Sequence, residues 1–319
     1  MPALHVISFH LLFSLCLFAK SKEKGTSVIE TNDSILVHAE NGKPIFKYLK
    51  KPSAQAEEHD PHFSRTGYIH PLHSPSGRII TGDYAADHPH QHGLFFAWTK
   101  SSFRGKPTEF WNQKKKLGDI RYQSSKWKTE KSGKVILESE QIFTTGKDSN
   151  DSIIKETWRI EIPPKQNDYY QFDLISTQSC ATDDPLLIQK YHYGGMAIRG
   201  NNQWMEKNEN GKPVGKMITS EEKNRENGNH SRPRWVAMYG PVDGESCGVV
   251  VMNHPDNFRF PQWVRLHPSM PYFVYAPMVQ ESFAIEPGKP YVSKFRYLIY
   301  DGTPDRKVIE GSWKEWIKN

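Results

Sequence analysis

Hydrophobic and polar residues alternate along most of this chain, which is the pattern of strands with one buried face. In the segment SIIKETWRIEI (152–162), Ile154 and Trp158 fall on one face of an extended chain, whereas Lys155 and Arg159 fall on the other. The pattern predicts a half-buried strand. Similar segments lie at residues 34–39, 44–49, 134–145, 169–179, 186–193, 234–239, 247–253, 272–276 and 293–300.

Turn-forming residues separate these segments and favour antiparallel pairing. Between the segments at 34–39 and 44–49, Asn41 and Gly42 stand where a hairpin turn needs positive φ angles. No internal repeat and no Pro/Ser-rich linker divides the chain. We therefore expect one large antiparallel β domain over residues 28–319, built as a sandwich of two sheets.

Helical periodicity is confined to the end of the chain. There Ile309, Trp313 and either Trp316 or Ile317 would lie on one side of a helix. The expected fold class is therefore all-β, with a short C-terminal helix.

Residues 1–19 have the features of a secretory signal peptide. An apolar stretch from about Val6 to Ala19 ends in a polar segment, and it is shorter than the roughly 20 residues of a membrane-spanning helix. We expect cleavage near Ala19, a secreted or periplasmic location and no membrane association afterwards. Beyond this segment, Cys180 and Cys247 could form one bridge or remain two buried thiols.

The charge pattern argues against a nucleic-acid partner. The 42 basic and 36 acidic side chains are scattered, and only Lys114–Lys116 forms a short basic run. A nucleic-acid surface needs clustered Lys and Arg on a suitable module. The sequence also lacks a P-loop, a dinucleotide fingerprint and a nucleophile elbow. None of these features determines the oligomeric state.

Three histidines at alternate positions are the main chemical signal. In DYAADHPHQHGLFFAW (83–98), His88, His90 and His92 would point to one face of a strand. Each buried imidazole needs hydrogen-bond partners, so three on one face are hard to explain by packing alone. We interpret them as part of a functional site.

One interpretation is a metal site, because imidazole is a common ligand of zinc, copper and iron. Two of the histidines with Asp87 or Asp83 would suit a single ion, but Asp87 faces away from His88 in a regular strand. The cluster is therefore an incomplete ligand set by itself. The alternative that remains is a metal-dependent oxygenase or hydrolase that holds a divalent ion with His88, His90 and His192.

The other interpretation is acid–base chemistry without a cofactor. Histidine titrates near pH 6.5, so it can accept or donate a proton at ambient pH. Glu281 or Asp256 could be the opposite partner. Neighbouring aromatic residues could form platforms on which sugar rings stack, and these are Phe95, Phe96, Trp98, Phe110 and Trp111.

Further polar candidates lie in two stretches that do not look like strands. The segment NHPDNFRFPQWVRLHPSMPYFVYAP (253–277) has too many prolines for a strand interior and is expected to cross the end of a sheet. Its Arg259 and Arg265 could bind a carboxylate or sulfate, and Arg199 could do the same. The polar tract 206–234 is expected to be a loop beside the site.

Several motifs together are similar to those of the PmoA-like family of secreted bacterial proteins. They are GYIHPLHSPSGRIIT, DHPHQHGLFFAW, the Phe110-Trp111 pair, YHYGGMAIRG, NHPDNFRFPQWVRL and PYFVYAP, and they span about residues 65–300. We regard the methane-oxygenase label of that family as a misnomer, because nothing after the leader could span a bilayer. The family pattern has histidine where this chain has Gln91, which should face away from His90.

The chain also resembles, more distantly, the galactose mutarotase-like superfamily, whose members act on sugars. In that superfamily a motif ending in His-Gly comes early, a His-aromatic pair follows near the middle, and a carboxylate base comes late. Here HQHGL, YHYGG and Glu281 or Glu286 follow this order. The resemblance implies a β-supersandwich with a sugar site at its open end.

These observations lead to the hypothesis of an exported carbohydrate-active enzyme of polysaccharide degradation. It would be a lyase, hydrolase or epimerase that uses His/Glu acid–base catalysis. We expect His90 and His192 to donate the proton and orient the substrate, His88 to assist, and Glu281 to be the base. The residues expected to bind substrate are Asp87, His92, Trp111, Arg199, Arg265 and His254. A carbohydrate-binding protein without catalysis is the remaining alternative.

Overall fold

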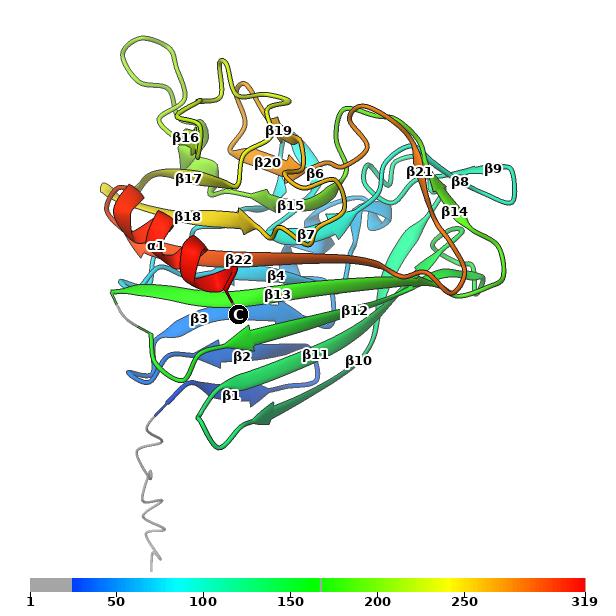
Figure 1. Cartoon of the computed structure of the whole chain (residues 1–319), viewed down its shortest axis with the longest axis horizontal. Coiled ribbons are helices and arrows are strands. Elements are labelled where there is room, and N and C mark those ends of the chain that lie inside the picture. The colour runs from blue at the N-terminus through cyan, green and yellow to red at the C-terminus, as the bar shows by residue number, and fades with distance from the viewer. Residues whose placement is uncertain (1–24, 167, 319) are drawn as a thin grey trace, which may run out of the picture.

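Two antiparallel sheets of eight strands form the body of the protein in this computed structural model, which describes residues 25–166 and 168–318 (Figure 1). In spatial order, the first sheet consists of β1 (Ser27–Glu30), β2 (Ser34–His38), β3 (Pro44–Leu49), β4 (Tyr68–Leu72), β7 (Leu94–Ala97), β15 (Gly195–Arg199), β20 (Tyr272–Tyr275) and β19 (Val264–Leu266). The second sheet consists of β10 (Asp119–Thr129), β11 (Val135–Thr144), β12 (Ser152–Ile162), β13 (Tyr169–Cys180), β22 (Tyr291–Asp301), β18 (Glu245–Asn253), β17 (Trp235–Val242) and β16 (Lys216–Thr219).

Smaller elements surround these sheets. A four-stranded sheet lies at one end of the sandwich (right in Figure 1) and contains β21 (Phe283–Ile285), β14 (Leu186–Ile188), β8 (Ser101–Phe103) and β9 (Lys106–Thr108). A two-stranded sheet pairs β5 (Asp83–Ala85) with β6 (His88–His92). The helical segments are η1 (Ala54–Glu58), η2 (Pro61–Phe63), η3 (Asn202–Met205) and α1 (Arg306–Trp316).

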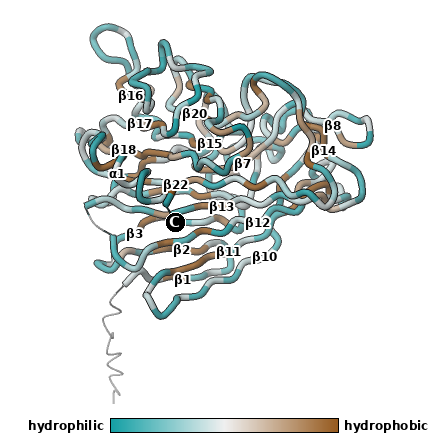
Figure 2. Tube along the Cα trace, in the orientation of Figure 1, coloured by the Kyte–Doolittle hydropathy of each residue, from teal (hydrophilic) through white to brown (hydrophobic). Residues whose placement is uncertain are grey.

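The alternation in the sequence produces the strands directly. On β12, Ile154 and Trp158 are buried while Lys155 is exposed. In the register with β13, buried Ile160 stands opposite buried Leu174, so the apolar faces of neighbouring strands coincide. In Figure 2, brown hydrophobic segments lie along strands such as β2 and β18, whereas the loops near β16 are largely teal.

Aromatic contacts join the two large sheets across the core. The rings of Phe46 on β3 and Phe172 on β13 have centroids 5.1 Å apart, and those of Tyr275 on β20 and Phe295 on β22 are 5.6 Å apart. The two inner faces therefore bury a common hydrophobic core. The predicted fold class, a large antiparallel β-supersandwich with a short C-terminal helix, is confirmed.

Helix α1 packs on the outer face of the second sheet (Figure 1). The Asp305 carboxylate caps its first turn by accepting hydrogen bonds from two backbone N–H groups. Ile309, Trp313 and Trp316 are buried against that face, as the helical periodicity predicted. Glu310 accepts hydrogen bonds from Arg234 at 3.0 and 3.1 Å, which ties the helix to the end of the β16–β17 connection.

The first hairpin differs in detail from the prediction. Only Gly42 of the Asn41-Gly42 pair has a positive φ, at 79°, and its N–H donates to the Ala39 carbonyl. This is a three-residue loop that ends in a left-handed residue, in which a single glycine supplies the reversal.

Three other expectations concern the signal peptide, membrane-spanning helices and the two cysteine thiols. The predicted signal peptide, residues 1–19, lies outside the described residues. Within the part of the chain that the structure describes, no helix has the length and apolarity needed to cross a membrane. Cys180 and Cys247 are free thiols and form no bridge.

Candidate active site

Segments that are distant in sequence line one small cavity of about 170 Å³. It contains five of the residues singled out from the sequence, namely His88, His90, His192, Trp111 and Arg265. The remaining lining residues are Gln91, Asn112, Tyr193, His267, Met270 and Tyr272. We call this space the inner cavity.

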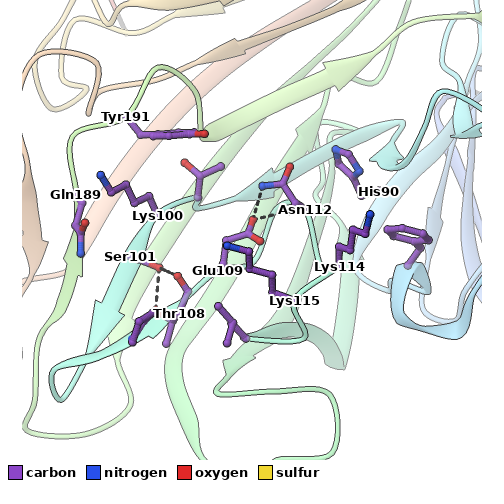
Figure 3. Close-up of a pocket in the computed structure, with 14 residues that line it drawn as sticks. His90, Lys100, Ser101, Thr108, Glu109, Asn112, Lys114, Lys115, Gln189 and Tyr191 are labelled. Atoms are coloured by element: carbon purple, nitrogen blue, oxygen red, sulfur yellow. Dashed lines mark hydrogen bonds between the residues drawn. The ribbon is translucent and has the colours of Figure 1, made fainter.

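A larger cavity of about 670 Å³ adjoins the inner cavity, and the two share His90 and Asn112. We call it the outer cavity (Figure 3). Its other lining residues are Phe63, Thr99, Lys100, Ser101, Pro107, Thr108, Glu109, Lys114, Lys115, Leu117, Gln189 and Tyr191. Its volume lies within the range of roughly 300–1,000 Å³ that small-molecule sites occupy.

His90 lines both cavities, and Figure 3 shows it among the residues of the outer cavity. Its ring packs edge-on against His88, with centroids 5.3 Å apart, and the ring of Phe63 lies at 6.3 Å. The imidazole makes no hydrogen bond within the described residues. Burial, with the nearby charges of His88, His92 and Arg199, lowers the pKa of His90 to about 3. The ring is therefore neutral at pH 7 and can accept a proton from a bound molecule.

A carboxylate and an arginine support this wall of the inner cavity from behind. One oxygen of Asp87 lies 3.2 Å from Nδ1 of His88, and the other accepts a hydrogen bond from Nη2 of Arg199 at 3.0 Å. Although burial alone would raise it, the Arg199 guanidinium and His88 hold the pKa of Asp87 below its usual value. Arg199 is fully buried and also donates to the side chain of Gln91 at 2.8 Å. Both residues therefore position the cavity wall, and neither lines the cavity.

Gln91 does not face away from the site as a regular strand predicts. It lines the inner cavity on the same strand as His90. The register of the β5–β6 pair shifts between Asp83 and Ala85, so side chains on β6 do not alternate strictly.

His92 is in the lining of neither cavity. It is fully buried, and its Nδ1 lies 2.8 Å from the Asp83 carboxylate, which also accepts hydrogen bonds from Tyr68 and Ser53. Burial lowers the pKa of His92. For Asp83, burial alone would raise the pKa, but the hydrogen bond and charge of His92 lower it. Neutral His92 therefore donates to ionised Asp83 and anchors β6 to β5.

His267 is a cavity residue to which the sequence analysis assigned no role. Its Nδ1 accepts hydrogen bonds from the backbone N–H groups of Met270, at 3.0 Å, and Ser269, at 3.3 Å. The proton of the neutral ring must then be on Nε2. Burial, followed by the charge of Arg265 and other nearby cations, lowers the pKa of His267 to about 4. The ring can thus donate one hydrogen bond from Nε2.

His192 and Tyr193 reach the cavity because two glycines follow them. Gly194 and Gly195 have φ angles of 130° and 128°, and a Cβ on Gly195 would lie 2.2 Å from the carbonyl oxygen of Tyr275. The glycines let β15 begin directly against β20. His192 is exposed at the rim, and burial, with the charge of Arg265, lowers its pKa.

Aromatic rings form one wall of the inner cavity. Trp111 is buried, and its ring centroid lies 5.3 Å from that of Tyr193 and 5.7 Å from that of Tyr272. The Tyr193 hydroxyl donates to the side-chain oxygen of Asn112 at 3.1 Å. Burial is the main reason why the pKa of Tyr193 rises to about 12, so the phenol keeps its proton at neutral pH.

Glu109 is the carboxylate that the structure places in the outer cavity. One of its oxygens accepts hydrogen bonds from the backbone N–H groups of Trp111 and Asn112 and from the Asn112 amide, and Figure 3 shows the contact between Glu109 and Asn112. Burial raises its pKa despite these bonds. No periodic pattern in the sequence points to this residue, because it lies in the loop between β9 and β10.

Arg265 supplies a positive charge to the inner cavity. It lies on β19 between two buried residues, Val264 and Leu266, and is itself partly exposed. Its guanidinium forms no ion pair or hydrogen bond within the residues that the structure describes. An unpaired guanidinium at a cavity wall is suited to bind a carboxylate or sulfate.

Four predicted carboxylates and histidines lie away from both cavities. Glu281 is exposed, with 71% of its side-chain surface accessible, and pairs with Arg259 at 2.9 Å. Glu286 pairs with Lys289 on the surface. His254 lies 3.5 Å from Asp256 and packs against Trp316 of helix α1. These positions argue against Glu281 as the base and His254 as a substrate ligand, because neither lines either cavity.

The polar tract 206–234 packs beside the site. It includes strand β16, and the His230 ring lies 3.3 Å from the backbone oxygen of His192. Arg225 donates to the carbonyls of His267 and Met270, which flank the inner cavity. The tract therefore supports the loop that carries His267.

No group of three or more His, Cys, Asp or Glu side chains in the described part of the chain is arranged to hold a metal ion. The histidine rings of the inner cavity pack edge-on, with the centroids of His88 and His267 6.4 Å apart. The alternative of an ion held by His88, His90 and His192 stays a hypothesis for elemental analysis.

Comparison with protein families defines the class of this chain. It belongs to a family of unknown function, DUF6807, whose model matches residues 36–314. The comparison does not show membership of the PmoA-like family, which the sequence motifs had suggested. A comparison with curated proteins finds no match.

Two solved structures resemble the fold at low similarity. Heparan sulfate lyase HepC from Pedobacter heparinus has 10% identity and a TM-score of 0.40, with 89% of this chain and 36% of that chain covered. The 4-alpha-glucanotransferase from Thermococcus litoralis has 10% identity and a TM-score of 0.25, with 85% and 39% covered. The chain thus spans well under half the length of either protein. At TM-scores this low, neither likeness indicates function.

Proposed function

We propose that this protein is an acid–base enzyme that acts on an acidic sugar, as a polysaccharide lyase or an epimerase. One observation carries the proposal. Neutral His90, protonated Tyr193 and unpaired Arg265 line the same inner cavity, beside the indole of Trp111. A base, an acid, an anion ligand and a stacking surface are thereby available to one sugar ring.

His90 is the base of this proposal. Its ring is neutral at pH 7 and has no protein partner among the described residues, so its nitrogens are free for a substrate proton. Arg265 binds the carboxylate of the sugar, which stabilises the negative charge that develops when the neighbouring carbon loses its proton. His267 adds one hydrogen bond from its Nε2.

Tyr193 is the acid of this proposal. In an elimination, His90 takes the proton from the carbon next to the carboxylate, and the C–H electron pair becomes a carbon–carbon double bond. The glycosidic C–O bond breaks, and Tyr193 gives its proton to the leaving oxygen. In an epimerisation the same first step is followed by return of a proton to the opposite face of the carbon.

Hydrolysis by a pair of carboxylates is less well supported. That mechanism needs two acidic side chains on either side of the glycosidic bond. Among the residues lining the two cavities, Glu109 is the one carboxylate. A secreted or periplasmic location, predicted from residues 1–19, fits a polysaccharide substrate.

The test is incubation of the protein with oligosaccharides that contain uronic acids and with neutral oligosaccharides of equal length. New ultraviolet absorbance from a conjugated double bond identifies a lyase, and a changed sugar configuration without cleavage identifies an epimerase. The double variant His90→Ala/His192→Ala should lose turnover by about 10²-fold or more. His254→Ala is the matched control, because His254 lies outside both cavities, and it should retain turnover.

Three results would contradict the proposal. Binding without any product would leave a carbohydrate-binding protein. Stoichiometric zinc, copper or iron, with turnover abolished by a chelator, would favour the metal alternative. Full turnover by a His90→Ala/His192→Ala variant whose circular dichroism is unchanged would exclude these histidines.

A further inference from the structure

We propose that the outer cavity is a second anion-binding subsite, so that the substrate is a polyanionic oligosaccharide with acidic groups on more than one sugar. The assignment of the inner cavity to the reacting sugar rests on the function proposed above. The acidic group in the outer cavity can be a carboxylate or a sulfate, since both are oxyanions that ammonium groups bind.

Three lysines carry this inference. Lys100, Lys114 and Lys115 line the outer cavity (Figure 3). Their ammonium groups form no ion pair and no hydrogen bond within residues 25–166 and 168–318. By contrast, the ammonium group of Lys134 pairs with the Glu161 carboxylate at 3.0 Å. The lysines of the outer cavity therefore present uncompensated positive charge to whatever enters it.

The single carboxylate of the cavity does not neutralise them. Glu109 directs one oxygen into hydrogen bonds with the backbone of its own loop, and burial raises its pKa despite the charge of Lys115 nearby. Its main contact is thus with the loop that it shapes. With one carboxylate against three ammonium groups, the outer cavity carries net positive charge.

The loop that bears two of these lysines is held in an unusual backbone conformation. Gln113 and Lys116 flank Lys114 and Lys115, and their φ angles are 58° and 56°. Non-glycine residues rarely adopt this left-handed region, and such strain is found mainly where the surrounding structure enforces it for a purpose. Lys114 and Lys115, which line the outer cavity, lie between these two left-handed residues.

The remaining lining of the outer cavity suits a sugar chain. Gln189 offers a polar side chain, and Phe63 and Tyr191 offer aromatic rings, while the hydroxyls of Ser101 and Thr108 bond to each other. His90 and Asn112 belong to both cavities, so one oligosaccharide can extend from the inner cavity into the outer one. The sugar next to the reacting sugar would then place its acidic group among the lysines.

Equilibrium binding tests the subsite without reference to turnover. The probes are an oligogalacturonate, a sulfated galactan oligosaccharide and a neutral galactan oligosaccharide of the same length. At least one acidic probe should bind more tightly than the neutral probe, and its affinity should fall as salt is added, because added ions screen exposed charges. The two acidic probes distinguish a carboxylate from a sulfate.

The variant Lys100→Gln/Lys114→Gln/Lys115→Gln should weaken binding of that acidic probe roughly tenfold, with no change for the neutral probe. The matched control is Lys128→Gln/Lys131→Gln/Lys165→Gln, which removes the same number of charges at exposed lysines outside both cavities and should bind as the unaltered protein does.

The subsite and the proposed function fail in different ways. Acidic probes that bind no better than the neutral one, or a triple variant that binds like the control, would overturn the subsite. Selective, lysine-dependent binding without any product would support the subsite and overturn the enzymatic proposal. If turnover occurs, the triple variant should raise KM and leave kcat within about twofold, because the lysines contact a sugar that does not react.

Discussion

The four imidazoles of the inner cavity differ in what holds them. The His267 ring is held by backbone donors on Nδ1, and the His88 ring lies against Asp87. His192 is exposed at the rim. His90 has neither a protein hydrogen-bond partner in the described residues nor an exposed position. This contrast is why His90, rather than its neighbours, is assigned to proton transfer.

The pKa of His90 leads to a prediction about pH dependence. A base works only when deprotonated, so the acidic limb of kcat/KM, which reports the free enzyme, should lie near the pKa of about 3. A bound carboxylate favours the charged imidazolium, so the limb of kcat should lie at higher pH. The measurement is a pair of pH–rate profiles on an acidic oligosaccharide. An acidic limb of kcat/KM centred at the ordinary pKa of histidine, about 6.5, would mean that another residue is the base.

Among the elements, strand β12 carries a buried acid that the proposed chemistry does not use. Glu156 is buried between the sheets, and one of its oxygens accepts hydrogen bonds from Ser176 at 2.6 Å and Gln178 at 2.9 Å. The other oxygen is buried without a partner among the described residues. Burial raises the pKa of Glu156. The folded state therefore favours its protonated form.

This raised pKa makes stability depend on pH. Protonated Glu156 contributes its full stabilisation of the fold at pH values below the pKa that Glu156 has in the unfolded chain. This contribution is lost as pH rises through the higher pKa that Glu156 has in the folded protein. Glu156→Gln mimics the protonated acid, so its free energy of unfolding relative to that of the unaltered protein should increase as pH rises from mildly acidic to alkaline values. Urea unfolding at several pH values measures this. The control Glu140→Gln, exposed on β11, should show no such gain, and a pH-independent difference for Glu156→Gln would contradict the expectation.

The strands and the site were not equally predictable from the sequence. Alternation places Ile154 and Trp158 correctly because strand periodicity is a local property. The positions of Glu109 and Glu281 depend on which loops meet in space, and no local pattern encodes that. Gln91 shows a third limit, because a register shift in a short strand pair changes which side chains face the cavity.

Across the whole molecule, sheets and helix are stabilised by separate apolar clusters. The larger cluster fills the space between the two sheets, and the smaller one lies under α1, where Trp313 contacts the outer face of the second sheet. Trp313 also donates from its indole N–H to the Asn253 carbonyl, and Arg234 lies 4.8 Å from its ring. The helix thus covers an apolar area that would otherwise face solvent.

Removal of that indole should destabilise the protein without touching the cavities. Trp313→Ala should lower the free energy of unfolding by about 3 kcal/mol, the usual cost of truncating a buried aromatic residue. Thermal and urea unfolding measure the loss. Lys314→Ala, at the exposed neighbouring position, should lie within about 0.5 kcal/mol of the unaltered protein. A loss for Trp313→Ala no larger than this would mean that α1 is not required for stability.

The connector between β9 and β10, residues 109–118, carries a consequence for how relatives of this protein can diverge. It holds Glu109, Asn112 and two of the lysines, and it is attached to the sandwich through the backbone bond from Phe110 to Trp98 and through the start of β10 at Asp119. Phe110 and Trp111, near the start of the connector, are buried in the core, whereas Lys114, Lys115 and Lys116 are exposed. An exchange confined to the exposed residues 114–116 should therefore change ligand charge preference in one step while the buried residues of the connector keep the scaffold intact, which makes these positions the natural place for directed evolution of specificity.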